Sequence, residues 1–122
     1  MTLAPIYPYS DSRKMRVALF ISGSGTNGLK IIERSKKPDA NYTVSLIFSD
    51  VKDERIRRNG SKMTRAKGIA SEQGISYEYV DIRDFYKERG LKRSDLSIRP
   101  DYDRLVLEKL KDYKLDLIAN AG

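Results

Sequence analysis

The stretch LFISGSGTNGLKII, residues 19–32, determines how the rest of the chain is expected to fold. Its apolar start stops at a glycine-rich turn, and apolar residues then return with the spacing of a helix. The turn follows the pattern G-x-G-x-x-G through Gly23, Gly25 and Gly28. The stretch therefore predicts a buried strand, a tight loop and a helix in direct succession.

A loop in this position can bind an anion. The N-terminus of a helix points backbone N–H groups outward at the positive end of its dipole, and glycine lets an anion approach without a Cβ in the way. We interpret Gly25, Thr26 and Asn27 as a candidate phosphate cradle, in which Thr26 offers a hydroxyl and Asn27 an amide. A tight turn without a ligand is the alternative interpretation.

Strands and helices are predicted to alternate along the rest of the chain. Four apolar, β-branched segments predict strands at 16–22, 42–49, 75–80 and 115–121. Helical patterns lie between them at 28–34, 61–73 and 101–114. Because such alternation builds parallel βαβ units, we predict an α/β fold with a Rossmann-like parallel sheet and flanking helices over residues 15–122. Residues 1–14 are predicted to form an N-terminal leader.

Two segments do not follow this alternation. Residues 86–99 are predicted to be an irregular insertion. The segment 52–67 is rich in basic residues, namely Lys52, Arg55, Arg57, Arg58, Lys62, Arg65 and Lys67. We interpret this basic segment as a solvated loop and helix face, with binding of a polyanion or an acidic partner as the alternative.

The composition limits the chemistry that the chain can perform. Its 122 residues carry a net charge of +7, which favours anionic partners, a phosphate-bearing ligand more than nucleic acid. The absence of cysteine excludes disulfides and thiolate catalysis, and the absence of histidine removes the commonest general base and metal ligand. We expect no metal site. No apolar run approaches the roughly 20 residues of a membrane span, and we expect a cytoplasmic setting.

The glycine pattern also permits a dinucleotide. Such a site needs an acidic residue at the end of the second strand to bind a ribose. Asp50 closes the segment YTVSLIFSD and occupies that position. An NAD-binding module using Gly23, Gly25, Gly28 and Asp50 therefore remains an alternative, as does a strand-end role for Asp50 alone.

Several motifs, taken in order, resemble one enzyme family. The segment RVALFISGSGTNGLKII resembles the opening of phosphoribosylglycinamide formyltransferases, the folate-dependent enzymes of purine synthesis. The similarity continues through LIFSD, through RAKGIASEQGI and into RPDYDRLVLEKLKDYKLDLIANAG, so that it covers most of residues 16–122. The resemblance implies the N-terminal half of a formyltransferase fold.

The resemblance also implies roles for individual residues. Gly25, Thr26 and Asn27 match the loop that binds the 5′-phosphate of glycinamide ribonucleotide. Arg99 matches an arginine near the site of the co-substrate 10-formyltetrahydrofolate, with an exposed structural arginine as the alternative. Tyr102 is expected to pack in the core. Gly28 and Asp50 depart from the family, which has a larger apolar residue and an asparagine there, and the link over 80–99 that leads to Arg99 is longer than the family's.

The family's catalytic Asn, His and Asp follow the Ala-Gly that corresponds here to Ala121 and Gly122. The resemblance therefore implies a substrate-phosphate-binding part with no catalytic residues of its own and negligible transfer activity. The fourth predicted strand then lies at the boundary of the sheet, so residues 117–121 are expected to form a bare apolar edge. Because such an edge can pair with another chain, we expect self-association or a partner that supplies further strands.

Overall fold

The structure is a computed structural model of the 122-residue chain, and it describes residues 3–5 and 14–122. The strands are β1 (Leu3–Pro5), β2 (Met15–Phe20), β3 (Tyr42–Ser49), β4 (Ser76–Tyr79) and β5 (Leu117–Asn120). The α-helices are α1 (Thr26–Ser35), α2 (Ala66–Gln73), α3 (Ile82–Glu88) and α4 (Arg99–Leu110). Short 3-10 turns, η1 (Leu96–Ile98) and η2 (Lys111–Tyr113), flank α4.

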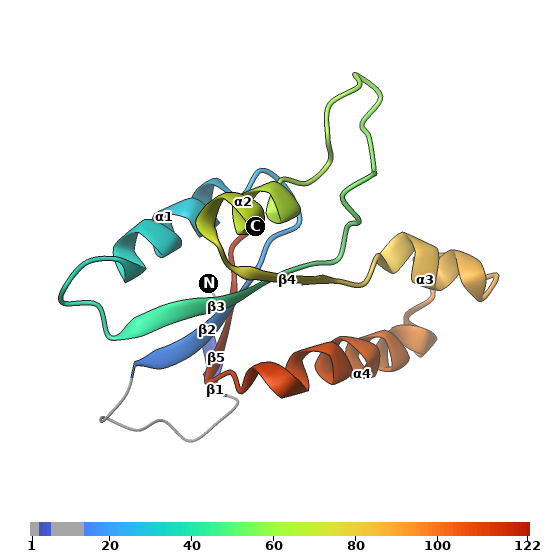
Figure 1. The fold of residues 1–122 in the computed structure, drawn as a ribbon. Helices are drawn as coiled ribbons and strands as arrows, with labels where there is room; N and C mark the ends of the chain where they lie inside the picture. The colour runs from blue at the N-terminus through green and yellow to red at the C-terminus, as the bar shows by residue number, and fades with distance from the viewer. Residues whose placement is uncertain (1–2, 6–13) are drawn as a thin grey trace.

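These elements form one twisted sheet with helices on both faces (Figure 1). The strand order is β1-β5-β2-β3-β4; β5, β2, β3 and β4 are parallel to one another, and β1 is antiparallel to β5. The predicted α/β fold, with its Rossmann-like parallel sheet and flanking helices, is confirmed. Because β2 lies in the centre, the glycine loop that follows it emerges at the middle of the carboxyl edge of the sheet.

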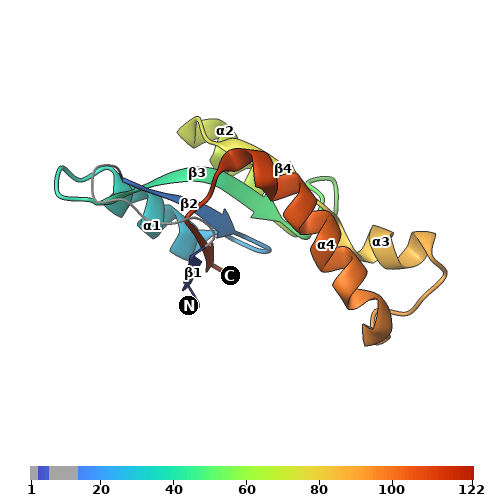
Figure 2. The ribbon, with the colours of Figure 1, turned by 90° about the horizontal axis from the view of Figure 1, so that it is seen from below.

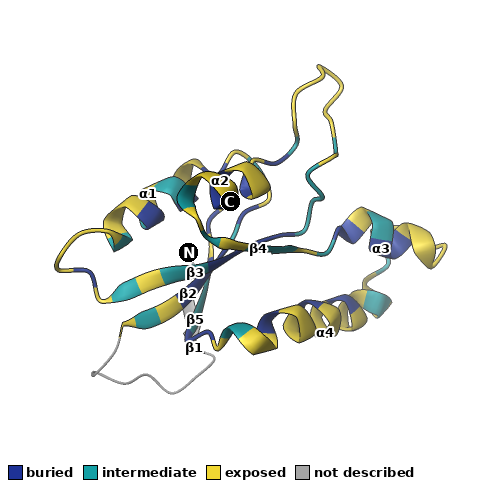
Figure 3. Ribbon diagram, viewed as in Figure 1, coloured by how far each residue is buried: buried dark blue, intermediate teal, exposed yellow. Residues whose placement is uncertain are grey.

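Alternate residues of the central strands supply two separate cores. Val17, Leu19 and Ile21 contribute to the core under α1 and α2. Ala18 on β2 and Phe48 on β3 contribute to the core under α3 and α4. This alternation is what strands buried on both faces require, and it explains their nearly continuous apolar sequence. Figure 3 shows the buried residues of the helices on the sides that face the sheet.

The structure corrects one predicted helix and one predicted irregular segment. The helix predicted over 61–73 begins only at Ala66, because Arg65 donates its backbone N–H to Gly23 O (3.0 Å) and Thr64 is buried before it. The insertion predicted over 86–99 is partly regular: α3 occupies 82–88, and η1 and the first residue of α4 end the segment. Figures 1 and 2 both place α3 beside α4 at the β4 end of the sheet.

The prediction of a bare β5 edge is wrong. Strand β1 pairs antiparallel with β5, with Leu3 opposite Ala119 and Pro5 opposite Leu117. Three residues of the predicted leader therefore belong to the sheet, while residues 1–2 and 6–13 lie outside the described residues. The described residues contain no helix with the length and apolarity that crossing a membrane requires.

Candidate functional site

The glycine loop turns sharply between β2 and α1. Gly25 immediately precedes the helix and has a φ of 74°, in the left-handed region that favours glycine. A Cβ at Gly25 would also lie 2.4 Å from Cδ1 of the buried Ile69 on α2. Glycine at this position is therefore required both by the backbone conformation and by the close approach of α2.

The first turn of α1 presents its donors to solvent. The first N–H groups of any helix lack acceptors within the helix, and here Thr26 and Asn27 are exposed. Ser24 Oγ lies 3.3 Å from Thr26 Oγ1, so two hydroxyls flank these N–H groups. Hydrogen bonds to the end of the chain anchor the start of this loop, because Ser22 and Gly23 donate their backbone N–H groups to Gly122 O at 2.6 and 3.3 Å. The arrangement is that of an anion site at a helix N-terminus.

Gly28 has a packing role that the sequence only partly indicated. A Cβ there would lie 2.7 Å from Cδ1 of Ile21, which is fully buried. The small residue thus lets α1 lie close to the end of β2. This explains why the larger apolar residue expected at this position is absent.

Arg99 and Asp50 line a common cavity. This hollow, of about 350 Å³, is called here the Arg99 cavity. Its lining consists of Phe20, Ile21, Ser22, Phe48, Asp50, Arg99, Tyr102, Asp103, Val106, Asn120 and Gly122. Phe20 and Phe48 pack with ring centroids 4.8 Å apart, so its apolar wall is aromatic. A concave site of this size that combines aromatic surface with polar side chains is typical of a small-molecule site.

Arg99 is only weakly restrained within this cavity. Its Nε lies 3.3 Å from Asp103 Oδ1, one helical turn away, and its guanidinium is 5.3 Å from the centre of the Tyr102 ring. About half of its side chain is exposed. Tyr102 itself is buried and donates its hydroxyl to Val80 O at 2.7 Å, as expected of a core residue.

Asp50 follows β3 directly and is fixed in orientation. It accepts a hydrogen bond from Ser22 Oγ at 2.7 Å, which joins the ends of β2 and β3. Asp50 and Ser22 lie between the Arg99 cavity and a second hollow of about 430 Å³, called here the Arg57 cavity. The lining of the Arg57 cavity is Ser22, Gly23, Asp50, Val51, Arg55, Arg57, Met63, Asp81, Ile82, Arg83, Arg93 and Gly122.

A buried carboxylate organises the loop on this side. Asp81 caps α3 by accepting the Asp84 N–H, and it also accepts from Arg55 Nε and Nη2 and from the Lys52 N–H, all between 2.8 and 2.9 Å. Burial alone would raise the pKa of Asp81, but these hydrogen bonds outweigh burial and hold its pKa well below the ordinary value. Lys52 Nζ also pairs with Asp84 at 2.8 Å, so Arg55 and Lys52, two members of the predicted basic segment, are structural cations.

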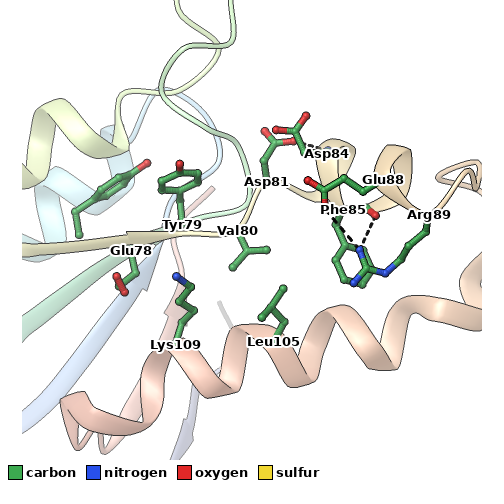
Figure 4. Close-up of a pocket in the computed structure, with 11 residues that line it drawn as sticks. Glu78, Tyr79, Val80, Asp81, Asp84, Phe85, Glu88, Arg89, Leu105 and Lys109 are labelled. Atoms are coloured by element: carbon green, nitrogen blue, oxygen red, sulfur yellow. Dashed lines mark hydrogen bonds and ion pairs between the residues drawn. The ribbon is translucent and has the colours of Figure 1, made fainter.

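A third hollow, of about 450 Å³, lies at the β4 edge and contains none of the residues predicted as site residues (Figure 4). There Arg89 places its guanidinium 3.6 Å from the centre of the Phe85 ring and donates to Phe85 O. The neighbouring Tyr77 hydroxyl is buried without a hydrogen-bond partner among the described residues, and burial raises its pKa to about 12. Tyr77 is therefore neutral at physiological pH.

The structure brings some predicted residues together and keeps others apart. Asp50, Arg99 and the strand end at Ser22 share one cavity, whereas Gly25, Thr26 and Asn27 line neither cavity. Sequence reasoning missed Asn120, a polar residue that interrupts the apolar run of β5 and lines the Arg99 cavity. It also missed Asp81, although the spacing of Asp81 and Asp84 before an apolar pair is a recognisable helix start. Within the described part of the chain, no group of three or more carboxylate, histidine or cysteine side chains is placed to bind a metal.

Comparison with known proteins supports the fold. No model of a known protein family matches the sequence, and no curated protein matches it. Among solved structures, glycinamide ribonucleotide transformylase 1 from Geobacillus kaustophilus is similar, with a TM-score of 0.60 and 24% identity over 88% of this chain. Phosphoribosylglycinamide formyltransferase from Bacillus halodurans is similar with a TM-score of 0.62 and 25% identity over 88% of this chain.

A structure with a different named activity has the same fold. Formyltetrahydrofolate deformylase from Pseudomonas putida matches with a TM-score of 0.60 and 15% identity over 92% of this chain. The chain spans 46% of the Geobacillus structure, 44% of the Bacillus structure and 32% of the deformylase. The fold of this chain is thus one that formyltransferases and formyltetrahydrofolate deformylases share, and the predicted resemblance is confirmed at the level of the fold.

Proposed function

We propose that this chain binds the 5′-phosphate of glycinamide ribonucleotide through Gly25, Thr26 and Asn27, as the N-terminal part of a folate-dependent formyltransferase. The observation that carries the proposal is the left-handed, tightly packed Gly25, which starts α1 at the carboxyl end of the central strand. This geometry leaves the first N–H groups of the helix and two hydroxyls facing solvent, where a phosphate gains from both hydrogen bonds and the helix dipole. The similarity to glycinamide ribonucleotide transformylases selects the substrate class.

We further propose that 10-formyltetrahydrofolate occupies the Arg99 cavity as co-substrate. The residues present fit such a molecule: Phe20, Phe48 and Tyr102 offer aromatic surface, and the exposed Arg99 offers a cation for a carboxylate. When bound, the co-substrate supplies the formyl group. Arg99 would orient it, and Asn120 would offer a hydrogen-bonding amide at the same cavity.

Transfer also needs a base for the substrate amine and donors for the tetrahedral oxyanion. The chain contains no histidine, and both carboxylates of the Arg99 cavity are engaged, Asp50 by the Ser22 hydroxyl and Asp103 by Arg99 Nε. We propose that the 122-residue chain binds substrate without detectable turnover. Transfer of a radiolabelled formyl group by the purified chain would contradict this part of the proposal.

The binding proposal is tested by calorimetric titration of glycinamide ribonucleotide. Thr26→Val and Asn27→Leu each remove a polar group and should weaken binding at least tenfold, since a hydrogen bond to a charged group contributes about 1.5–3 kcal/mol. Asn41→Leu is the matched control, because Asn41 is exposed at the opposite edge of the sheet and precedes β3. Equal affinity of all four proteins would contradict the proposal.

A dinucleotide site is the second candidate, because Gly28 lets α1 approach Ile21 as the third glycine of that pattern does, and Asp50 lies at the end of β3. In this case NAD should bind and Asp50→Ala should abolish its binding. Under the leading proposal, NAD binds no more tightly than ribose 5-phosphate, and Asp50→Ala leaves ribonucleotide affinity within twofold.

A further inference from the structure

The Arg57 cavity collects guanidinium groups from three separate parts of the chain. Arg57 lies on the loop between β3 and α2, Arg83 lies in the first turn of α3, and Arg93 follows α3. All three are exposed, and they line the same hollow as Gly23 at the start of the glycine loop. The fold therefore brings together cations that the sequence separates by up to 36 positions (93 − 57).

The acidic groups in this cavity do not neutralise these three cations. Asp81 is fully engaged by Arg55 and by two backbone N–H groups. Asp50 accepts the Ser22 hydroxyl and keeps its negative charge, but the four arginines of the lining (Arg55 with the three above) outnumber its two carboxylates. Within the described residues no carboxylate forms an ion pair with Arg57, Arg83 or Arg93, and the Arg83 guanidinium instead contacts Met63 Sδ at 4.0 Å.

The loop that carries Arg57 is held in place by other contacts. Arg55 pairs with both Asp81 and Asp84, and Arg57 itself donates its backbone N–H to Ser61 O at 2.7 Å. Lys62 pairs with Asp53 at 2.5 Å across the same loop. The Arg57 backbone is thus anchored, while its side chain forms no ion pair among the described residues.

Three like charges around one hollow repel one another, and an anion with several charges would relieve that repulsion. Guanidinium groups match phosphoryl oxygens through paired N–H donors, which makes arginine well suited to phosphate recognition. The volume of about 430 Å³ suits a small ligand rather than a nucleic-acid backbone, which would need an extended basic stripe.

We propose that the Arg57 cavity is a second anion-binding site, separate from the N-terminus of α1, which takes a small ligand with adjacent phosphoryl groups such as a pyrophosphate. The site uses none of Gly25, Thr26 and Asn27, so it does not depend on the proposed function. Its ligand would reach Gly23 at one end and the arginines at the other, on the β3 side of the glycine loop.

The test is titration of inorganic pyrophosphate into the full chain at constant ionic strength. Arg57→Gln and Arg93→Gln should each weaken binding at least fivefold. Arg58→Gln is the matched control, because Arg58 is exposed, adjacent in sequence and equal in charge but does not line the cavity. Arg58→Gln should change the affinity for pyrophosphate by less than twofold. All the substituted residues are exposed, and circular dichroism checks that each variant is folded.

Further titrations distinguish binding in the Arg57 cavity from binding at the N-terminus of α1 and from attraction to the net positive charge of the chain. The pyrophosphate binding that Arg57→Gln and Arg93→Gln weaken should persist in Thr26→Val and Asn27→Leu, whereas loss of all pyrophosphate binding in these two variants alone would overturn the proposal. An equal loss in Arg58→Gln would also overturn it, because net charge would then explain the binding. Citrate should bind at least tenfold more weakly than pyrophosphate, and equal affinity would contradict the preference for phosphoryl groups.

Discussion

Gly25 has two structural constraints that can be separated by experiment. Its φ of 74° is unfavourable for any residue with a Cβ, and the space beside it is occupied by Ile69 Cδ1. Gly74, which ends α2, has a similar φ of 66°, but a methyl group there would have no atom within 4 Å. The two glycines therefore form a matched pair.

We predict that Gly25→Ala destabilises the chain more than Gly74→Ala. Left-handed backbone costs a residue with a Cβ about 1–2 kcal/mol, which both variants share. Overpacking against Ile69 adds about 1–3 kcal/mol in Gly25→Ala only. Urea unfolding measures both free energies, and equal losses would show that the contact with Ile69 is not tight.

At the residue scale the sequence predicted part of the site. The pattern of three glycines indicated a tight turn, because left-handed backbone and close packing both select glycine. It did not reveal that Gly25 approaches α2 while Gly28 approaches Ile21, since these contacts join residues distant in sequence. Asp50 was correctly placed at a strand end, but its Ser22 partner depends on the pairing of β2 with β3.

At the element scale, Asp81 connects α3 with the long loop between β3 and α2. It caps α3, binds Arg55 from the long loop, and accepts the Lys52 N–H. A carboxylate that is buried and surrounded by donors is costly to remove, because its partners lose their acceptor in a region of low water content.

We predict that Asp81→Asn destabilises the chain by about 3 kcal/mol, a value typical of breaking a buried ion pair. Chemical unfolding at pH 7 gives the difference in free energy. Asp39→Asn is the control, because Asp39 pairs with Arg34 and both side chains are exposed, and such an exposed pair should contribute less than about 1 kcal/mol. A loss in Asp81→Asn no larger than in the control would contradict the structural role of this cluster.

The lowered pKa of Asp81 also predicts how the free energy of unfolding depends on pH in acid. The folded-state pKa of Asp81 lies below its ordinary value, which is about 3.9 in an unfolded chain. The stabilisation is therefore complete above that value and is lost as the pH falls from about 4 toward the folded-state pKa. The difference in unfolding free energy between wild type and Asp81→Asn should be constant from pH 8 to 5 and shrink below pH 4; a constant difference down to pH 2 would contradict it.

Elements were predicted well where burial dictates the pattern and less well elsewhere. The strands β2 and β3 were predicted nearly in full, because both of their faces are buried. The start of α2 was wrong by five residues, because a hydrogen bond from Arg65 to Gly23 stops the helix there. The helix α3 was missed, since its seven residues are too few for a clear apolar period.

At the scale of the whole molecule, β1 changes the boundary of the sheet. It pairs with β5 and so covers an edge that the sequence predicted to be bare. Three residues, Leu3, Ala4 and Pro5, are too short to indicate a strand, and their partner lies more than 110 positions away. This pairing could not be predicted from local patterns.

We predict that removal of residues 1–5 promotes self-association, because it leaves the backbone groups on one side of β5 unpaired. Sedimentation velocity should show larger species that grow with concentration. Removal of residues 1–2 alone keeps β1 and is the control, and neither deletion changes the number of charged side chains. Identical sedimentation of the two deletions would contradict the protective role of β1.

Binding of a ribonucleotide phosphate at the N-terminus of α1 is the proposal on which the function of this chain depends most. An amide NMR titration of the 122-residue chain with glycinamide ribonucleotide tests it residue by residue. We expect the amide signals of Gly25, Thr26, Asn27 and Gly28 to shift most, in a saturable manner, while those of the loop around Arg57 move little. Absence of shifts at these four amides, with saturable shifts elsewhere or none at all, would contradict phosphate binding at this helix.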